Sequence, residues 1–216
     1  MNACAKPSST CSPVTEEDRK AAYEHGASTY EKDVCSGEAW LGIDKARKAL
    51  LHHARGKVLE VASGTGHNFD LYPSDCRITA ADNCEAMAKI CQSKSSPNVE
   101  SIHVMDTADL KFLDQSFDTV VDTFGICSYE DPLASLQEMQ RVCKVDGKIL
   151  LLEHGRSWFT PLNWMLDRSA ANHAKKWGCW WNRDIRDIVS KSGLQVVESK
   201  SYHLGTTHLV VAKRSI

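Results

Sequence analysis

Apolar positions along the chain change their spacing near residue 57, and this change predicts where a sheet begins. Upstream, apolar residues recur at helical spacing in two stretches, 15–30 and 37–53, with Thr15 as the cap of the first. Downstream, strand-sized apolar runs alternate with helical ones. The predicted strands are 57–62, 77–81, 101–105, 117–124 and 148–154, and the predicted helices among them are 65–72, 85–93 and 132–143.

This alternation of strands and helices is typical of an α/β fold with parallel strands. Two further strand-like runs, 194–203 and 207–213, are joined by Leu-Gly-Thr and predict an antiparallel hairpin at the end. We therefore expect a Rossmann-like, doubly wound sheet of seven strands, mostly parallel, with helices on both faces and a C-terminal antiparallel hairpin.

Length and composition suit one domain, which we place at residues 15–216 of the 216. Residues 1–14 are rich in Ser, Pro and Cys, and we expect them to be disordered. The 26 basic and 28 acidic residues give a net charge of −2, so a nucleic-acid partner is not expected. No apolar run approaches the roughly 20 residues of a membrane-spanning helix. The first residues match no leader pattern, so the cytoplasm is the default location.

The nine cysteines do not form a recognisable metal or disulfide pattern. They show no CxxC pair and no tight Cys/His spacing, and their number is odd, so we expect reduced thiols and no metal site. They stand at positions 4, 11, 35, 76, 84, 91, 127, 143 and 179.

The end of the first predicted strand carries the first candidate binding motif. Glycines at 64 and 66 let the backbone pass close to a ligand, and a helix starting near Thr65 would direct free N–H groups into the same crevice. Glu60 beneath this loop suits a cation or the amino group of an amino-acid ligand better than a pyrophosphate. Ala62 stands within the loop, and we expect it to have a negative φ.

Two more acids follow at the ends of the next strands. Asp82, followed by Asn83, ends the second strand about 20 residues on, where an acid binds ribose hydroxyls in dinucleotide folds. Asp106 follows the third strand, where it reaches an adenine amino group. The alternative is that these acids are turn residues and helix caps with no ligand.

Four segments resemble the methyltransferase-11 type of class I S-adenosylmethionine-dependent methyltransferases. They are VLEVASGTGHN, ITAADNCEAM, MDTADLKFLDQSFDTVV and LASLQEMQRVCKVDGKILLLEHGR, and the resemblance extends over about 23–211. The resemblance implies S-adenosylmethionine as cofactor. It implies that the methionine part of the cofactor is contacted by Glu60, Gly64 and Gly66. It also implies that Asp82 and Asn83 contact the ribose, and that Asp106 and Thr107 contact the adenine. Thr123 or Phe124 would then lie where the sulfonium and the acceptor meet. Ala62 stands where the family usually has a glycine, and we expect it to contact the cofactor as well.

Candidate catalytic and substrate-binding residues are less specific. His154, directly after the fifth strand, is the candidate general base; the alternative is a hydrogen-bonded structural histidine. Five of the six tryptophans fall in an insert at 157–181, which reads as a lid facing an apolar acceptor or a membrane surface, or else as a satellite core. The residues predicted to contact the substrate are Tyr30, Tyr129, Trp158, Trp164, Trp177 and His203.

The sequence is compatible with three functions. The first is methyl transfer to a small apolar acceptor, a quinone precursor or a lipid, with peripheral membrane contact. The second is a catalytically silent S-adenosylmethionine-binding assembly factor. The third is an NAD-dependent oxidoreductase, which would need a third glycine where Phe69 stands. One segment, LLEHGRSWFTPLNWMLDRSAANHAKKWGCWWNRDI, resembles a mitochondrial inner-membrane branch of the family, so the mitochondrion is the alternative location.

Overall fold

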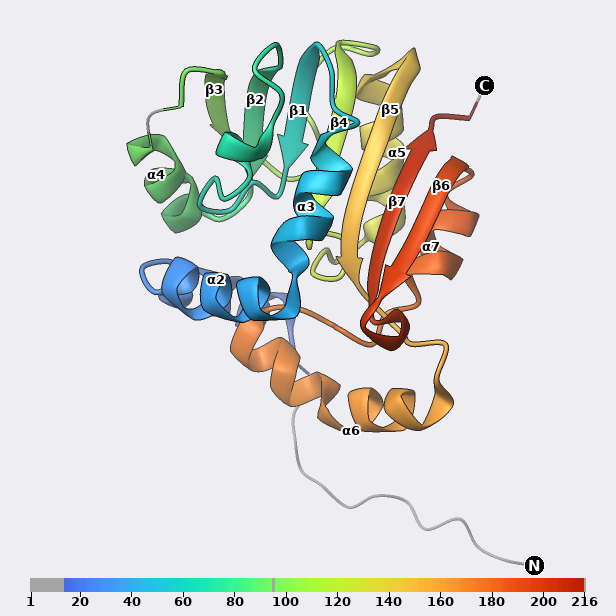
Figure 1. The fold of residues 1–216 in the computed structure, drawn as a ribbon. Coiled ribbons are helices and arrows are strands. Elements are labelled where there is room, and N and C mark those ends of the chain that lie inside the picture. Colours follow the sequence, from blue (N-terminus) through green and yellow to red (C-terminus); the bar gives the residue numbers. More distant parts are fainter. Residues whose placement is uncertain (1–13, 95, 216) are drawn as a thin grey trace, which may run out of the picture.

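Seven strands form one mixed sheet in the order β3-β2-β1-β4-β5-β7-β6, as the computed structural model shows for residues 14–94 and 96–215 (Figure 1). The predicted disorder of residues 1–14 therefore lies, except for its last residue, outside the described residues. The strands are β1 (Lys57–Val61), β2 (Arg77–Asp82), β3 (Val99–Val104), β4 (Phe117–Thr123), β5 (Cys143–His154), β6 (Gln195–Tyr202) and β7 (Thr207–Lys213).

The first five strands are parallel, and β7 runs antiparallel to both β5 and β6. The predicted fold class and the C-terminal hairpin are thus confirmed. The chain winds outward through β2 and β3 and then returns to place β4 against the other side of β1. In open parallel sheets this reversal point opens a crevice at the carboxyl ends of the strands, where ligands bind.

Helices cover both faces of the sheet. They are α1 (Glu16–Gly26), α2 (Tyr30–Leu41), α3 (Ile43–Leu51), α4 (Glu85–Ser93), α5 (Pro132–Val142), α6 (Thr160–Trp177) and α7 (Ile185–Lys191), with short 3₁₀ turns η1 (Phe69–Leu71) and η2 (His203–Gly205). Helix α3 packs on β5 and β7, whereas α5 packs on β4 and β5. The two resulting cores share the central strands, whose side chains alternate between them: Leu59 and Val61 of β1 face one core, and Val58 faces the other.

The N-terminal region forms three helices, α1 to α3, where apolar spacing predicts two helical stretches. The first predicted stretch, 15–30, ends at Gly26, and α2 begins at Tyr30. Gly42 has φ +74°, a left-handed conformation that ends α2 and starts α3 within the second predicted stretch. Both α2 and α6 lie below the sheet, at the end toward which β1 and β5 point (Figure 1).

The helix predicted for 65–72 is wrong. Consecutive turns occupy 64–68, and only η1 follows. Gly64 and Gly66 have φ +54° and +76°, and a left-handed residue interrupts a right-handed helix. A Cβ on Gly66 would stand 2.5 Å from the Phe69 ring, so the turn closes tightly over that side chain. The expected helix N-terminus therefore does not point into the crevice.

Most of the tryptophan-rich insert is helix α6, which ends at Gly178 in a left-handed C-cap with φ +73°. Helix α6 packs against α1. Among the helices of residues 14–94 and 96–215, none has the length and apolar content needed to cross a bilayer.

Candidate active site

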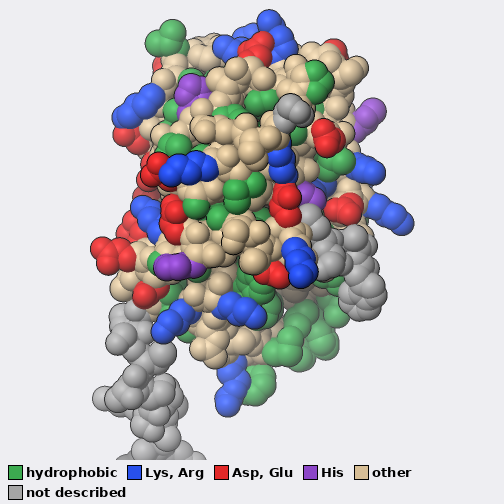
Figure 2. Space-filling model, turned by 90° about the vertical axis from the view of Figure 1, so that its left-hand side faces the viewer, with side chains coloured by type: hydrophobic (Ala, Val, Ile, Leu, Met, Phe, Trp, Pro, Cys, Tyr) green, Lys and Arg blue, Asp and Glu red, His purple; other side chains and the backbone are tan. Residues whose placement is uncertain are grey.

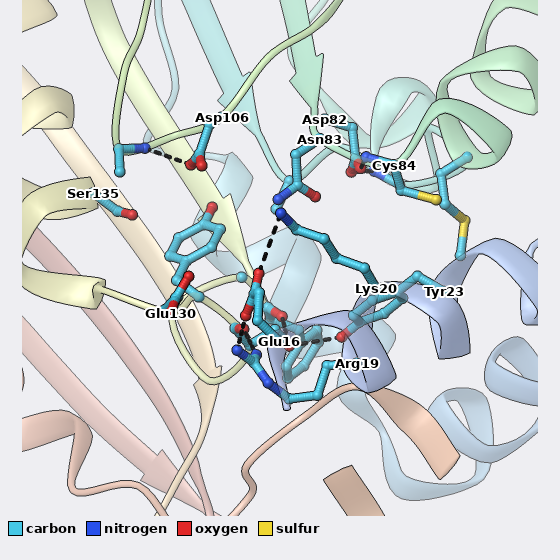
Figure 3. A pocket seen from close by; sticks show the side chains of 18 of the residues that line it. Glu16, Arg19, Lys20, Tyr23, Asp82, Asn83, Cys84, Asp106, Glu130 and Ser135 are labelled. Carbon is cyan, nitrogen blue, oxygen red and sulfur yellow. Dashed lines mark hydrogen bonds and ion pairs between the residues drawn. The ribbon is translucent and has the colours of Figure 1, made fainter. Parts of the chain in front are cut away.

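A cavity lies at the carboxyl ends of β1, β2 and β4, where the sheet topology predicts a ligand (Figure 3). Helix α1 closes one side of it. From the strand ends it is lined by Ala62, Gly64, Asp82, Asn83, Asp106, Thr123 and Phe124; from the helices and the loop after β4 it is lined by Glu16, Arg19, Lys20, Tyr23, Tyr30, Ser128 and Tyr129. Six of the nine predicted cofactor residues are thus brought to one cavity.

The loop after β1 is tied directly to the end of β2. The Gly64 N–H donates to Asp82 Oδ2 at 2.7 Å, and the Cys84 N–H donates to Asp82 Oδ1 at 2.8 Å. Burial raises the pKa of Asp82, and these two hydrogen bonds oppose that shift. The Asp82 carboxylate therefore fixes the glycine loop and the start of α4 in one arrangement.

Ala62 has φ +47°, so the expectation of a negative φ was wrong. The chain turns sharply here to leave β1, and the Ser63 N–H donates to the carbonyl of Ala81 at 3.1 Å on the neighbouring strand. This turn gives Ala62 a conformation that glycine adopts without steric cost. Ala62 nevertheless lines the cavity beside Gly64.

Asp106 and Asn83 lie at the mouth of the cavity, and both are exposed. Asp106 Oδ1 accepts the Ala108 N–H at 2.9 Å. Thr107 is buried behind this turn, and its hydroxyl donates to the Tyr129 hydroxyl at 3.2 Å. Thr107 therefore supports the cavity wall from behind.

A buried polar network beneath the loop was not predicted from the sequence. Arg47 of α3 is 4% exposed and donates two hydrogen bonds to Glu38 of α2, at 2.7 and 2.8 Å. Its Nη1 also donates to Asn68 Oδ1 and Thr123 Oγ1, both at 3.0 Å. The network holds Thr123 in the cavity wall and links α2 and α3 to the sheet.

Glu60 belongs to this network rather than to the cavity lining. Its two oxygens accept hydrogen bonds from Asn68 Nδ2 at 3.0 Å and the Tyr72 hydroxyl at 2.7 Å. Burial raises the pKa of Glu60 to about 7, although these hydrogen bonds and Arg47 lower it. Glu60 therefore acts on the loop through Asn68.

Aromatic side chains form the opposite wall of the cavity. Tyr23, Tyr30, Phe124 and Tyr129 line it. Phe124 has φ +63°, and its ring lies 4.9 Å from the Arg47 guanidinium carbon. Burial raises the phenol pKa of Tyr30 and Tyr129, so both stay neutral donors. The cavity thus combines a polar half at the strand ends with an aromatic half under α1.

Helix α1 supplies charged groups that sequence reasoning missed. In Figure 3, Arg19, Lys20 and Tyr23 project from this helix into the cavity. Arg19 is buried, donates to the Ser128 carbonyl and pairs with Glu16. The sequence indicated only the start of the helix, where Thr15 and Asp18 form a capping box.

Two buried carboxyl groups lie side by side behind the aromatic wall. Asp122 of β4 and Glu153 of β5 are both 0% exposed, and each has one oxygen without a hydrogen-bond partner. Burial raises the pKa of Asp122 to about 7 and that of Glu153 well above its usual range. The Asp122 carboxyl raises the pKa of Glu153 further, whereas a hydrogen bond with Glu153 lowers the pKa of Asp122. The pair therefore holds protons that isolated carboxyls would lose.

The remaining predicted site residues do not line the cavity. Gly66 lies in the turn over Phe69, and His154 stacks behind Phe124 with ring centroids 4.3 Å apart. Trp158 and Trp164 are 62% and 68% exposed on the outer surface, and Trp177 is not part of the lining either. His203 contacts the Leu41 carbonyl at 2.8 Å, outside the cavity. Of the six predicted substrate residues, the structure brings Tyr30 and Tyr129 to the cavity.

The chain is similar to known methyltransferases. Residues 59–151 match the family model of a methyltransferase domain. The chain is 36% identical over 214 residues to the mitochondrial methyltransferase OMS1 of Saccharomyces cerevisiae, covering 89% of this chain and 45% of that protein. It therefore spans about half the length of this relative.

Bacterial relatives are matched over more of their own length. A phosphatidylethanolamine N-methyltransferase of Cereibacter sphaeroides is 30% identical over 161 residues, covering 71% of this chain and 78% of that protein. A demethylmenaquinone methyltransferase of Clavibacter sepedonicus is 34% identical over 139 residues, covering 62% and 56%. Among solved structures, an S-adenosylmethionine-dependent methyltransferase of Thermotoga maritima superimposes with a TM-score of 0.69 at 21% identity, covering 90% of this chain and 99% of that one. This last likeness supports the fold.

Proposed function

The chain belongs to the class I S-adenosylmethionine-dependent methyltransferases of the methyltransferase-11 type, and from this premise we propose that it methylates a small apolar acceptor, a quinone precursor or a lipid. The observation that carries the proposal is the division of the cavity. Its polar half, formed by Ala62, Gly64 and Asp82, suits the cofactor, and its aromatic half suits an apolar acceptor.

The polar half fits S-adenosylmethionine by its own geometry. Gly64 has open space where a Cβ would stand, so a ligand can approach its backbone. In this arrangement the Asp82 carboxylate binds the ribose hydroxyls, the exposed Asp106 binds the adenine amino group, and Thr123 lies near the sulfonium. The cofactor supplies an activated methyl group, so the protein's task is to position the acceptor and exclude water.

The aromatic half supports an acceptor with a ring or an acyl chain. Tyr23, Tyr30, Phe124 and Tyr129 offer flat apolar faces, and the hydroxyl tips of the three tyrosines can hold one polar group of the acceptor. Two of the relatives are named for phosphatidylethanolamine and demethylmenaquinone, a lipid and a quinone precursor. Because His154 lies behind Phe124, we expect it to transfer no proton to the acceptor.

An exposed apolar surface at α6 supports peripheral contact with a membrane, from which such an acceptor would enter. Its members are large apolar side chains at least 45% exposed: Trp158, Phe159, Trp164, Met165 and Leu204. The Arg168 guanidinium lies 5.7 Å from the Trp164 ring, and Lys175 and Lys176 follow in the last turn. Figure 2 shows hydrophobic side chains gathered at this lower end of the molecule, beside basic ones. Amphipathic aromatic and basic faces of this kind bind lipid interfaces.

Binding and turnover test the function directly. We expect calorimetry to detect binding of S-adenosylmethionine and S-adenosylhomocysteine, but not of NAD; binding of NAD alone would favour an oxidoreductase. Comparison of methylated quinones and lipids in cells with and without the gene should reveal the acceptor. Cofactor binding with no methylated product from either class would favour the silent assembly factor.

Vesicle sedimentation tests the membrane contact. We expect the protein to sediment with vesicles of phosphatidylcholine and an anionic phospholipid. Trp158→Ser and Trp164→Ser should each reduce this fraction, whereas Leu113→Ser, at an 83% exposed site elsewhere, should not. A wild-type protein that stays in the supernatant would rule the contact out.

The location is part of the same proposal. OMS1 is named as mitochondrial, which favours the mitochondrion over the cytoplasm for this chain. Tagging the native protein and fractionating organelles would decide between them, with recovery in the cytosol alone as the contrary result.

A further inference from the structure

Three metal-binding side chains from distant segments meet behind the aromatic wall. Cys127 lies in the loop after β4, His154 ends β5, and Cys179 follows the C-cap of α6. The two sulfurs are 3.1 Å apart, and Cys179 Sγ is 3.8 Å from His154 Nδ1. One donor atom from each of the three lies within 4.8 Å of the others.

The donor set and its dimensions suit zinc. Two thiolates and an imidazole are ligands that Zn²⁺ prefers, with bonds of about 2.3 Å to sulfur and 2.0–2.1 Å to nitrogen. Tetrahedral coordination at these lengths places two sulfurs about 3.8 Å apart. The sulfurs of Cys127 and Cys179 need to separate by less than 1 Å to reach that distance, roughly a side-chain adjustment.

Contacts outside the cluster hold both cysteine ligands in place. The Cys127 N–H donates to Glu153 Oε2 at 3.2 Å, and its carbonyl accepts the Trp180 N–H at 2.9 Å. The Cys179 carbonyl bonds to His173 Nδ1 at 2.9 Å. Such support orients metal ligands before the ion arrives.

Burial and charge are also compatible with an ion here. Cys127 is 0% and Cys179 6% exposed, so water competes little for the site. Zn²⁺ with two thiolates and a neutral imidazole carries no net charge, which limits the cost of burial. Two arginines donate to this loop, and both bind backbone carbonyls rather than a sulfur: Arg183 Nη1 binds the Ile126 carbonyl at 2.6 Å, and Arg19 binds that of Ser128.

We propose that Cys127, His154 and Cys179 bind a Zn²⁺ ion, with one coordination position left to water or another small ligand. The ion joins the loop after β4, the end of β5 and the C-terminal end of α6. Because Phe124 and Ser128 flank Cys127 and line the cavity, it fixes the aromatic wall in place. The spacing of 127, 154 and 179 matches no zinc motif, which is why the sequence predicted no metal.

Metal content of the full chain tests the proposal. Protein purified with a thiol reductant and incubated with Zn²⁺ should retain about one zinc per chain after gel filtration. Replacing the zinc by Co²⁺ should give thiolate-to-cobalt charge-transfer absorption and the visible bands of a tetrahedral ion.

Conservative variants and a buried-thiol control sharpen the result. Cys127→Ser and Cys179→Ser should weaken zinc binding at least about tenfold, since loss of a direct ligand exceeds the loss of an outer contact. Cys143→Ser should keep wild-type zinc, because this buried thiol bonds to the Lys148 carbonyl at the opposite end of β5. Wild-type protein with no zinc and no cobalt-thiolate absorption would overturn the proposal. So would Cys127 and Cys179 recovered as a disulfide, which would assign the pair to thiol oxidation instead.

Discussion

Ala62 and Phe124 share a left-handed backbone conformation at the ends of two adjacent parallel strands. Their φ angles are +47° and +63°, β1 and β4 are paired, and both residues line the cavity. For residues with a Cβ this conformation costs about 1–2 kcal/mol each. Backbone strain concentrated at a ligand site is typical of positions that function requires. The Phe124 N–H donates to the Leu152 carbonyl at 2.8 Å, so the sheet itself holds one of the two strained residues.

Replacing Ala62 by glycine should relieve part of this strain. Glycine removes the steric cost of the left-handed conformation but adds entropy to the unfolded chain, so we expect Ala62→Gly to stabilise the fold by about 0.5–1 kcal/mol. Urea unfolding at equilibrium measures this directly. Affinity for S-adenosylmethionine, measured by calorimetry, should stay equal or increase, because the cavity lining loses only a methyl group.

A matched control separates strain from side-chain size. Ala80 is fully buried within β2 and outside the left-handed region, so Ala80→Gly should destabilise the fold by roughly 0.5–1 kcal/mol or more. We expect the change in the free energy of unfolding to have opposite signs at the two positions. Equal losses at both would show that Ala62 carries no relievable strain.

The sheet could be predicted from the sequence because its inner strands are mostly buried and all its strands are separated by turn residues. Every predicted strand overlaps an observed one, and β5 differs most, beginning at Cys143 rather than 148. Local apolar spacing did not reveal where helices break, because it does not record that Gly42 and Gly66 adopt left-handed conformations. The predicted helix at 65–72 failed for that reason.

The site was predictable where chain order alone determines position. Asp82 and Asp106 follow successive parallel strands, so they had to end at the same edge of the sheet. Arg47 was missed because its partners lie up to 76 residues away along the chain. No local sequence pattern marks a helical arginine as buried. No local pattern predicts that Cys127 and Cys179 lie side by side, either.

Asp82 should be essential for holding the cofactor loop. In Asp82→Asn, one of the two backbone N–H groups that donate to the carboxylate would face an amide NH₂ instead of an acceptor. Losing a charged hydrogen bond costs about 1.5–3 kcal/mol, so S-adenosylmethionine affinity should fall at least about tenfold. Calorimetry measures the change.

Asp109→Asn is the comparison for Asp82→Asn, because Asp109 is exposed and pairs with Lys111, two residues further along the chain. It should leave affinity unchanged. Equal affinity in wild type and Asp82→Asn would remove Asp82 from the cofactor site.

The buried Arg47–Glu38 pair should matter more to stability than any surface pair. Arg47→Met leaves the Glu38 carboxylate buried without its partner, which costs about 3–5 kcal/mol. Glu38→Gln combined with Arg47→Met should cost clearly less than the sum of the two single changes. Urea unfolding of all four proteins gives the coupling free energy.

Lys89→Met is the surface counterpart, since Lys89 pairs with Glu85 where both side chains are about two-thirds exposed. It should change stability by less than about 0.5 kcal/mol. A comparable loss at Lys89 and Arg47 would contradict the role of burial.

The acid pair Asp122–Glu153 should make the fold less stable as pH rises. Burial raises the pKa of Asp122 from 3.8 to about 7 and raises that of Glu153 as well, so the folded state binds more protons than the unfolded state between about pH 4 and 7. Stability from this pair is therefore fully present below the unfolded pKa and is lost as pH increases through the folded pKa. Asp122→Asn removes one titrating carboxyl and can donate its amide to the unpartnered Glu153 oxygen.

Asp122→Asn should consequently flatten the pH dependence of stability. Between pH 4.5 and pH 8, the free energy of unfolding of the variant should rise by roughly 2 kcal/mol relative to that of wild type. A shift of a few pKa units shared by two carboxyl groups implies a difference of this size. Urea unfolding across this range measures the difference. Asp146→Asn, whose carboxyl is 84% exposed, should run parallel to wild type. If the Asp122→Asn curve also ran parallel to wild type, the pair would not hold a proton in the folded state. Because Glu60 has its own raised pKa of about 7, a smaller dependence should persist in the variant.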